Sequence, residues 1–358
     1  MNPVRCLSVI VPCYNEEKTL RRSVQRLLAV ETSRLSLDII IVDDCSTDKS
    51  PEVARELEQK HENIRFIGLD KNRGKGFALR TGFAKAKGDF VAIHDADLEY
   101  DPLDLPRLVA MLEEHGTDVA FGSRYLNRSS RRVLSFWHSW MNRSLTTLSN
   151  MFTDLDLTDM ETCYKVFRKE ALDKLDLKEN RFGIEPEMTA AIARAGLTVS
   201  EAGISYAGRT WAEGKKINAW DGLRALYCIF HYNAPSLPAP VQFLIYLFIG
   251  GVAAVANFAF FAFLLPFVSL ATATILAFIG AAAVNYFLSI ALLFRHKARW
   301  NAFSEILVYG AVVTVVGAID LLMTKGLVAT GATPYGAKLT ATAVGLFLNF
   351  LGRKYFVF

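Results

Sequence analysis

Three carboxylates alternate within a five-residue stretch of the chain, as Asp95, Asp97 and Glu99. Val91, Ala92 and Ile93 just before them predict a buried strand, so the acids follow the end of that strand. Carboxylates this close repel one another, and a shared cation removes the repulsion. Oxygen ligands without His or Cys suit a hard ion, Mg²⁺ or Mn²⁺. The spacing therefore favours a metal site over a solvated turn.

Polar residues also follow two other strand-like runs. The Val/Ile-rich runs 7–12 and 37–44 are separated by a helical pattern at 16–28, which predicts a mostly parallel sheet covered on both faces. Ligands of such sheets bind beyond the carboxyl ends of the strands. A lone aspartate such as Asp44 could instead cap a helix. We expect one site from the residues that end these three strands: Pro12, Tyr14, Asn15, Glu16, Asp43, Asp44, Asp95, Ala96 and Asp97.

The segment NRGKGFALRTG carries glycines and basic residues but is not a Walker A loop, which needs GxxxxGK[ST]. Gly74 and Gly76 would let backbone N–H groups approach an anion, and Lys75 or Arg80 could contact a phosphate. A turn into a helix with a solvated Lys75 remains equally open.

The length and composition indicate two domains. A chain of 358 residues is too long for one compact core, and we expect domains at 1–232 and 240–358. The net charge of +4 is too small to indicate a nucleic-acid partner. The five cysteines lack metal-type spacing, so buried, reduced thiols are expected.

Two aromatic, amphipathic segments lie at 133–152 and 218–233. In the first, Trp137, Trp140 and Leu145 share an apolar stripe with other large side chains, and the opposite face is polar. Such helices lie flat in a membrane interface. Helices that face an ordinary protein core are the alternative, and the tryptophans favour the interface.

The second domain reads as membrane-embedded. Residues 241–294 contain no Asp, Glu, Lys or Arg, and this run is long enough for two spanning helices of about 20 residues each. Four spans fit the apolar pattern, at about 241–265, 268–294, 305–328 and 335–356.

The charges flanking these spans predict the topology. The first apolar run of the chain is short and ends at Pro12, unlike a signal peptide, so the soluble half is expected in the cytoplasm. Four spans then put the basic segments 295–300 and 353–354 on the cytoplasmic side, as the positive-inside rule requires. The sequence predicts an integral protein of the inner (plasma) membrane with both termini cytoplasmic.

The membrane half also repeats itself, since VNYFLSIALLF matches LNFLGRKYFVF. Asn285 and Asn349 each stand nine residues before a Phe. Tyr246 and Tyr309 each stand eleven residues before a polar residue, the second being Asp320. Two copies of a helix pair are the simplest account. The polar residues mark either a lipid path or interhelical hydrogen bonds.

Five motifs, SVIVPCYNEE, IIVDDCSTD, NRGKGFALRTGF, DADLEYDP and GSRY, resemble in this order the inverting GT-A-type sugar-nucleotide transferases. The likeness is closest to the polyprenyl-phosphate glycosyltransferases typified by dolichol-phosphate mannose synthase. It covers the soluble half end to end, and the membrane half resembles the GtrA-like domain. The resemblance implies an α/β, Rossmann-like GT-A domain, followed by two interface helices and an all-α domain of four transmembrane helices.

The resemblance also implies the reaction and its site. A single sugar moves, with inversion and a metal, from a GDP- or UDP-linked donor to dolichyl or undecaprenyl phosphate in the bilayer. Asp95 and Asp97 match the DxD metal motif, whereas the archaeal-type synthases carry Gln in place of Glu99. The residues that match the nucleotide pocket are Pro12, Tyr14, Glu16, Asp43 and Asp44. Two arginines, Arg124 and Arg209, match positions that contact the acceptor phosphate. Arg143 is a third candidate on a looser alignment, and Lys215 is a lesser candidate for the same role.

We expect no essential general base. A phosphate monoester has its second pKa at about 6 and arrives already anionic, so cations must draw it to the donor. Arginine suits this task because its planar fork binds two oxygens at once. Asp159 and Glu161 are the acids that would serve if a base were needed.

Two other functions are weighed against this one. A processive polysaccharide synthase needs a QxxRW motif, and none of Gln25, Gln59 and Gln242 begins one. A lipid transporter or scaffold with a degenerate transferase domain conflicts with the intact DxD motif. The sequence names neither the sugar nor the base, and it leaves open whether the chain forms a homo-oligomer.

Overall fold

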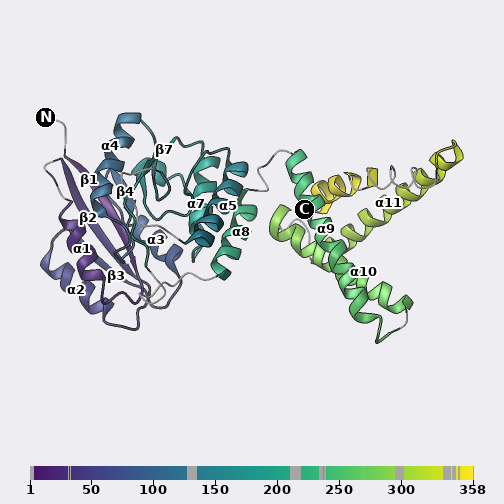
Figure 1. Ribbon diagram of the computed structural model, residues 1–358, viewed down its shortest axis with the longest axis horizontal. Helices are drawn as coiled ribbons and strands as arrows, with labels where there is room; N and C mark the ends of the chain where they lie inside the picture. The colour runs from purple at the N-terminus through teal and green to yellow at the C-terminus, as the bar shows by residue number, and fades with distance from the viewer. Residues whose placement is uncertain are drawn as a thin grey trace. The chain divides into compact units, whose positions relative to one another are not determined.

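The computed structural model describes residues 4–30, 32, 34–126, 135–209, 219–233, 237, 239–268, 270–294, 302–333, 340, 344–345 and 347–357. The chain divides into two compact units, Met1–Tyr232 and Asn233–Phe358, whose elements Figure 1 labels. Several segments used in the sequence predictions lie outside the described residues: 133–134, Lys215, 295–300 and 335–339.

The N-terminal unit is built on a seven-stranded sheet in the order β3-β2-β1-β4-β6-β5-β7. β6 runs antiparallel to its neighbours β4 and β5, and the other neighbours pair in parallel. The predicted mostly parallel α/β sheet is confirmed. The strands are β1 Arg5–Cys13, β2 Leu35–Asp43, β3 Ile64–Gly68, β4 Phe90–Ile93, β5 Val119–Ser123, β6 Lys165–Arg168 and β7 Val199–Gly203.

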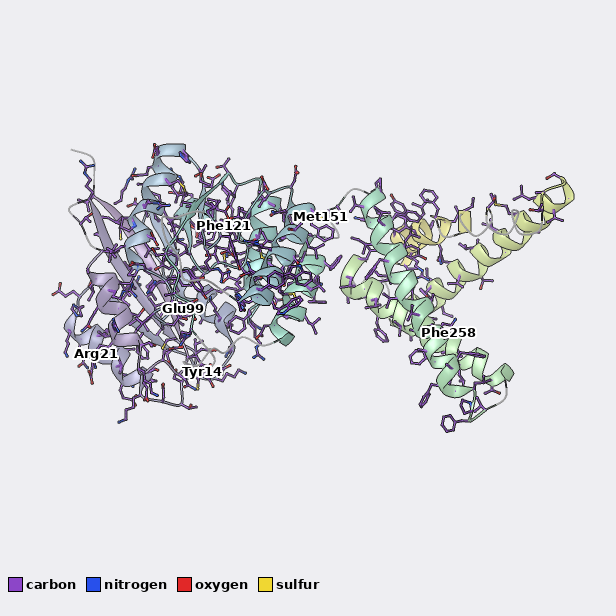
Figure 2. All side chains as sticks on the ribbon, viewed as in Figure 1. Tyr14, Arg21, Glu99, Phe121, Met151 and Phe258 are labelled. Carbon is purple, nitrogen blue, oxygen red and sulfur yellow. The ribbon has the colours of Figure 1, made fainter. Side chains whose placement is uncertain are left out.

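The core of this unit lies on the central strands. Leu7, Val9 and Ile10 of β1 and all of β4 are buried, which is why these strands read as continuous apolar runs. Each such side chain contributes about 1.5–3 kcal/mol when fully buried. Figure 2 shows Phe121 of β5 inside this unit, where it is fully buried. A rigid sheet therefore carries the loops at its carboxyl edge.

Helices connect and cover the strands, and one begins later than predicted. The pattern at 16–28 forms a helix only from Leu20, and before it the N–H groups of Glu16 and Glu17 donate to Ser50 Oγ and Asp48 Oδ2. The helices are α1 Leu20–Leu28, α2 Ser50–Lys60, α3 Lys75–Phe83, α4 Leu105–His115, α5 Phe136–Thr153, α6 Lys169–Leu172, α7 Ile184–Arg194 and α8 Ala219–Asn233.

The apolar stripe of the amphipathic helix α5 is partly exposed and partly buried. Trp137 and Trp140 are exposed, whereas Leu145 packs against Met160, Ala225 of α8 and other apolar side chains. On the polar face, Asn142, Thr146 and Ser149 are buried. α5 therefore turns this part of its polar side to the protein and leaves large apolar side chains at the surface.

The C-terminal unit is helical in its described residues. It contains α9 Ala239–Leu264, α10 Leu270–Ser289 with a π-helical turn at Ile290–Phe294, and α11 Ala302–Ala329. The helical residues 347–352 end in a second π-helical turn, Arg353–Val357. Over the described residues, Pro240–Leu264 is the helix long and apolar enough to cross a membrane, with shorter apolar helices at Ile279–Leu293 and Leu307–Val316.

All five cysteines are free. Cys13, Cys163 and Cys228 are buried, and Cys6 and Cys45 are half-buried. The reduced thiols expected from the spacing are therefore found, although two of the five remain partly accessible.

Candidate active site

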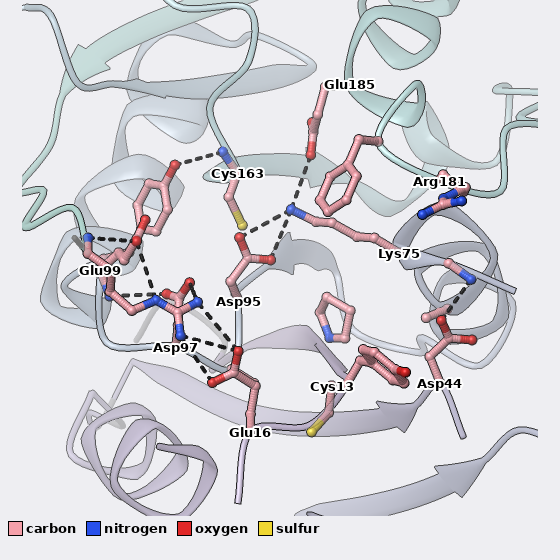
Figure 3. A pocket seen from close by; sticks show the side chains of 18 of the residues that line it. Cys13, Glu16, Asp44, Lys75, Asp95, Asp97, Glu99, Cys163, Arg181 and Glu185 are labelled. Carbon is pink, nitrogen blue, oxygen red and sulfur yellow. Dashed lines mark hydrogen bonds and ion pairs between the residues drawn. The ribbon is translucent and has the colours of Figure 1, made fainter. Parts of the chain in front are cut away.

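A cavity of about 420 Å³ opens among the loops of the N-terminal unit (Figure 3). β1 lies between β2 and β4, so the polar ends of these three parallel strands meet at one edge, as the sequence predicts. Most of the proposed site residues line the cavity: Pro12, Tyr14, Glu16, Asp44, Lys75, Asp95, Ala96, Asp97, Glu99, Arg124 and Arg209.

Arg209 is surrounded by three carboxylates. Its Nη2 lies 2.8 Å from Asp97 Oδ2, its Nη1 3.3 Å from Glu16 Oε2 and its Nε 3.4 Å from Glu99 Oε1. Dashed lines that reach these three acids in Figure 3 mark the contacts. Glu99 also accepts hydrogen bonds from the Arg209 N–H at 2.8 Å and from Tyr206 Oη at 2.6 Å. Glu99 therefore anchors the segment 206–209.

The acids around Arg209 carry more charge than one guanidinium can balance. Burial, followed by the charges of Asp95 and Glu99, raises the pKa of Asp97 to about 7, and Arg209 only partly opposes them. Among the described residues, no group of three His, Cys, Asp or Glu side chains is arranged to hold an ion, because the carboxylates hold Arg209 and Lys75 instead. Oxygen-only donors with excess negative charge fit a divalent cation once Arg209 moves aside.

Lys75 is the second cation of the cavity. Its Nζ lies 2.9 Å from Asp95 Oδ1 and 3.4 Å from Glu185 Oε1 (Figure 3). Burial alone would raise the pKa of Asp95, but the charge of Lys75 together with hydrogen bonds from Lys75 and Cys163 holds that pKa below its usual value. Lys165 pairs with Glu185 from the other side, at 2.5 Å. Lys75 is therefore paired and largely buried, not solvated.

The two glycines beside Lys75 serve close packing. A Cβ on Gly74, whose φ is 97°, would lie 2.5 Å from the Asn180 carbonyl oxygen, and one on Gly76 would lie 2.4 Å from that of Glu179. The N–H of Gly74 donates to Asp44 Oδ2 at 2.7 Å. The space that an anion would need is therefore taken by protein, which favours the turn into a helix over an anion-binding loop.

Two of the proposed nucleotide contacts support the loops rather than line the cavity. Asp43 accepts hydrogen bonds from Ser46 N–H and Oγ, at 2.9 and 2.6 Å. Asn15 accepts one from the Thr47 N–H at 2.8 Å, and its φ of 52° turns the chain after β1. The sequence predicts Asp43 and Asn15 in the site, but their side chains hold these loops and do not line the cavity.

Arg124 is held by a buried aspartate. Its Nε and Nη2 donate to the two oxygens of Asp159, each at 2.7 Å, and Asn142 of α5 donates to the same carboxylate at 3.0 Å. Burial alone would raise the pKa of Asp159, but Arg124 lowers it below its usual value. A carboxylate with both oxygens occupied and a low pKa is a poor general base.

Arg143, a further proposed cation, lies apart from the cavity. Arg143 is exposed on α5, with its guanidinium 5.2 Å from the ring centre of Tyr125, and it does not line the cavity. Lys215 lies outside the described residues.

Residues that the sequence analysis missed complete the walls. Arg181, Phe182 and Glu185 come from the segment before and into α7, and Tyr100 and Tyr206 pack edge to face at 5.1 Å. The only signal in the sequence is the pair of glutamates in NRFGIEPE, which stand in an otherwise apolar stretch.

Two family models match the chain in succession. Residues 8–176 match glycosyl transferase family 2, and residues 245–358 match the GtrA/DPMS transmembrane domain. The first match spans β1 to β6 and includes the three strand ends that meet at the cavity.

Several relatives with curated names are sugar transferases. An undecaprenyl-phosphate 4-deoxy-4-formamido-L-arabinose transferase of Pseudomonas aeruginosa is 28% identical over 74% of this chain and 74% of its own length. A dolichol-phosphate mannosyltransferase of Pyrococcus furiosus is 28% identical over 63% of this chain and 64% of its own. Glycosyltransferase AglD of Haloferax volcanii is 31% identical over 54% of this chain, but the chain spans only 32% of that protein's length.

Solved structures of glucosyl-3-phosphoglycerate synthase from Mycobacterium tuberculosis share the fold. Two of them, one with UDP and one with Mn²⁺, UDP-glucose and phosphoglyceric acid, each reach a TM-score of 0.51 at 19% identity. Each covers 65% of this chain and 81% of its own. The chain is a membrane glycosyltransferase that joins a glycosyl transferase family 2 domain of GT-A fold to a GtrA/DPMS transmembrane domain.

Proposed function

We propose that the chain moves a single sugar from a nucleotide-diphosphate sugar to a polyprenyl phosphate, with inversion and with a divalent metal. The observation that carries this proposal is the cavity that combines excess carboxylates with a buried Arg124 and a half-buried Arg209, in a chain that continues into a membrane domain. The names of the Pseudomonas and Pyrococcus relatives, both transferases to a polyprenyl phosphate, support the acceptor class.

The metal is assigned to Asp95 and Asp97, with Glu99 close by. When bound, it offsets the charge of the departing diphosphate. Glu99 already accepts from Tyr206 and Arg209, so we assign it to holding that segment rather than to direct ligation. Mg²⁺ and Mn²⁺ both suit these oxygens, and a structural neighbour binds Mn²⁺.

The nucleotide of the donor is assigned to the loops after β1 and β2. Tyr14 is exposed at the cavity, where its ring can stack on a base, and Pro12 lies beside it in the wall. Asp44 is also in the wall, although its oxygens are engaged by the N–H groups of Arg73 and Gly74. UDP and GDP remain alternatives, with UDP present in the solved neighbours.

The acceptor phosphate needs cations because it approaches a diphosphate of the same sign. Arg209 is the first choice, since a metal at Asp97 would release its guanidinium toward the cavity. Arg124 is the second, and Arg143 and Lys215 are assigned to the path of the lipid headgroup toward the site. Because Asp159 is locked to Arg124, the proposed transfer uses no essential general base.

The exposed apolar face of α5 supports the proposed membrane arrangement. Trp137 is 73% exposed and Met151 74%, and Figure 2 labels Met151 at the surface of its unit. We assign this face to the membrane interface. In this proposal residues 1–232 form the cytoplasmic catalytic domain, and residues 240–358 cross the inner membrane in four spans.

The test offers the purified full-length protein a panel of labelled UDP- and GDP-sugars, with undecaprenyl or dolichyl phosphate and Mg²⁺ or Mn²⁺. One lipid product carrying one sugar is expected. Products with longer sugar chains would indicate a processive synthase. No labelled lipid with any pair would leave the transporter or scaffold as the better reading.

A further inference from the structure

The cavity holds a carboxylate, Glu161, that no residue described in the structure pairs. Glu161 lines the cavity, and its Oε1 is shielded from water. Neither of its oxygens accepts a hydrogen bond from any residue that the structure describes. The other acids of the wall all have a cationic or N–H partner: Glu16, Asp44, Asp95, Asp97, Glu99 and Glu185.

The cations near Glu161 are already used. Lys165 is fully buried and donates to Glu185 and to the carbonyls of Met160 and Thr162. Arg124 is fixed on both oxygens of Asp159. The two cations whose charges act on Glu161, Lys165 and Arg124, are therefore both engaged with other acids.

The surroundings of Glu161 shift its pKa. Burial, followed by the charge of Glu185, raises the pKa of Glu161 to about 7. An acceptor left without a donor in a shielded place is costly, and because Glu161 lines the cavity it can take its donor from a bound molecule. A ligand with N–H or O–H groups is therefore expected at this wall.

The chemistry of the two substrates decides which part meets Glu161. The diphosphate of the donor and the phosphate of the acceptor are anions that only accept hydrogen bonds, so both would be repelled. The nucleotide is assigned to the loops after β1 and β2. The sugar carries hydroxyl or amino groups, and it must lie between the diphosphate and the acceptor for transfer to occur.

We propose that Glu161 binds the sugar of the donor, by accepting a hydrogen bond from one of its hydroxyl or amino groups. This inference rests on the proposed function, because it takes the ligand to be a sugar nucleotide. It defines the substrate class as a neutral or amino sugar. A uronic acid is disfavoured, since its carboxylate would add a negative charge to a cavity already rich in carboxylates.

The test separates recognition of the sugar from recognition of the nucleotide. Calorimetry on the full-length protein with Mn²⁺ compares free UDP and GDP with UDP-glucose, UDP-N-acetylglucosamine, GDP-mannose and UDP-glucuronic acid. Glu161→Gln should bind the free nucleotides within twofold of wild type but the matching neutral sugar nucleotide roughly tenfold or more weakly. Glu113→Gln, at an exposed ion pair with Arg5, is the matched control.

Three results would overturn the inference. One is an equal loss of affinity for the free nucleotide and the sugar nucleotide, which would indicate a structural role. Another is unchanged affinity for both. The third is intact binding of donor and acceptor with turnover abolished, which would make Glu161 a general base. If wild type transfers no sugar at all, the proposed function fails, while the binding comparison still decides the role of Glu161.

Discussion

Arg209 in the N-terminal unit and Arg353 in the C-terminal unit are both largely shielded from solvent, but the partners of their guanidinium groups differ. Arg209 faces three carboxylates. Arg353 is 4% exposed and has no carboxylate partner among the described residues; it donates to Asn285, to Asn349 at 3.2 Å and to Tyr309 at 3.0 Å. One cation sits among excess charge and the other among neutral dipoles.

The difference indicates what each arginine can do. Without Arg209 the pKa of Asp97 would rise further, because Arg209 lowers it, so the acids there would need either protons or another cation in its place. The partners of Arg353 are neutral, so they would bind another cation only weakly. Its guanidinium also joins parts of the chain that lie 68 and 44 residues away in sequence. We infer an exchangeable cation in the first place and a permanent cross-link in the second.

The largest expected effect belongs to the exchangeable site. Asp97→Asn should lower turnover by about a thousandfold or more, because it weakens the hold on the ion that offsets the diphosphate's charge. Titration of Mn²⁺ by electron paramagnetic resonance, beside the transfer assay, measures both losses. Asp173→Asn, at an exposed ion pair with Lys169, is the control. Full activity after treatment with EDTA would refute the metal assignment.

The same titration has a pH dependence of known sign. Because protons and metal ions compete for Asp97, whose pKa is about 7, Mn²⁺ affinity should rise with pH up to about 7 and level off above it. Asp97→Asn should remove that rise. A flat profile in the wild type would show that Asp97 does not bind the ion.

The next effect concerns the balanced pair of Arg124 and Asp159. Arg124→Lys keeps the charge but loses the fork, so we expect turnover to fall about tenfold with nearly unchanged affinity for the donor. Asp159→Asn should instead cost about 3–5 kcal/mol of unfolding free energy, since it leaves Arg124 buried without its partner. Thermal unfolding beside the transfer assay separates the two. A stably folded Asp159→Asn that binds both substrates without turnover would restore a general base.

The smallest effect on chemistry is expected at Arg353. Arg353→Gln should lower the unfolding free energy by about 1–3 kcal/mol, because Asn285, Asn349 and Tyr309 lose a shared donor. Binding of UDP or GDP should stay within twofold. Lys354→Gln, one residue on, is the matched control for thermal stability in detergent. A large loss of nucleotide binding in Arg353→Gln but not in Lys354→Gln would show that Arg353 is more than a structural cross-link.

The sequence predicts the edge of the sheet but not the partners there. The acids after β1, β2 and β4 could be located because parallel strands end together. Arg209 lies 112 residues from Asp97 and 193 from Glu16, and no local pattern records such pairs. Asp43 could not be told from Asp44 for the same reason, since which of two adjacent acids faces the cavity depends on Ser46 and Gly74.

The second half of the sheet also escaped prediction. β5 contains a glycine and β6 begins with Lys165, a residue that strands rarely bury. Lys165 is nevertheless fully buried, because Glu185 of α7 neutralises it. On α5 the periodicity identified the two faces, but which face turns inward is decided by Asp159, which accepts from Asn142. Tertiary partners, absent from local sequence, settle both cases.

The buried thiols have a practical consequence for mapping the membrane topology. Burial raises the pKa of Cys13 to about 12 and raises those of Cys163 and Cys228 as well, so these thiols are poor nucleophiles toward maleimides at neutral pH. Replacing the half-buried Cys6 and Cys45 should therefore give a nearly silent background in the native protein. A reporter cysteine placed at 295–300 can then be labelled from one side of the membrane at a time, without rebuilding the core.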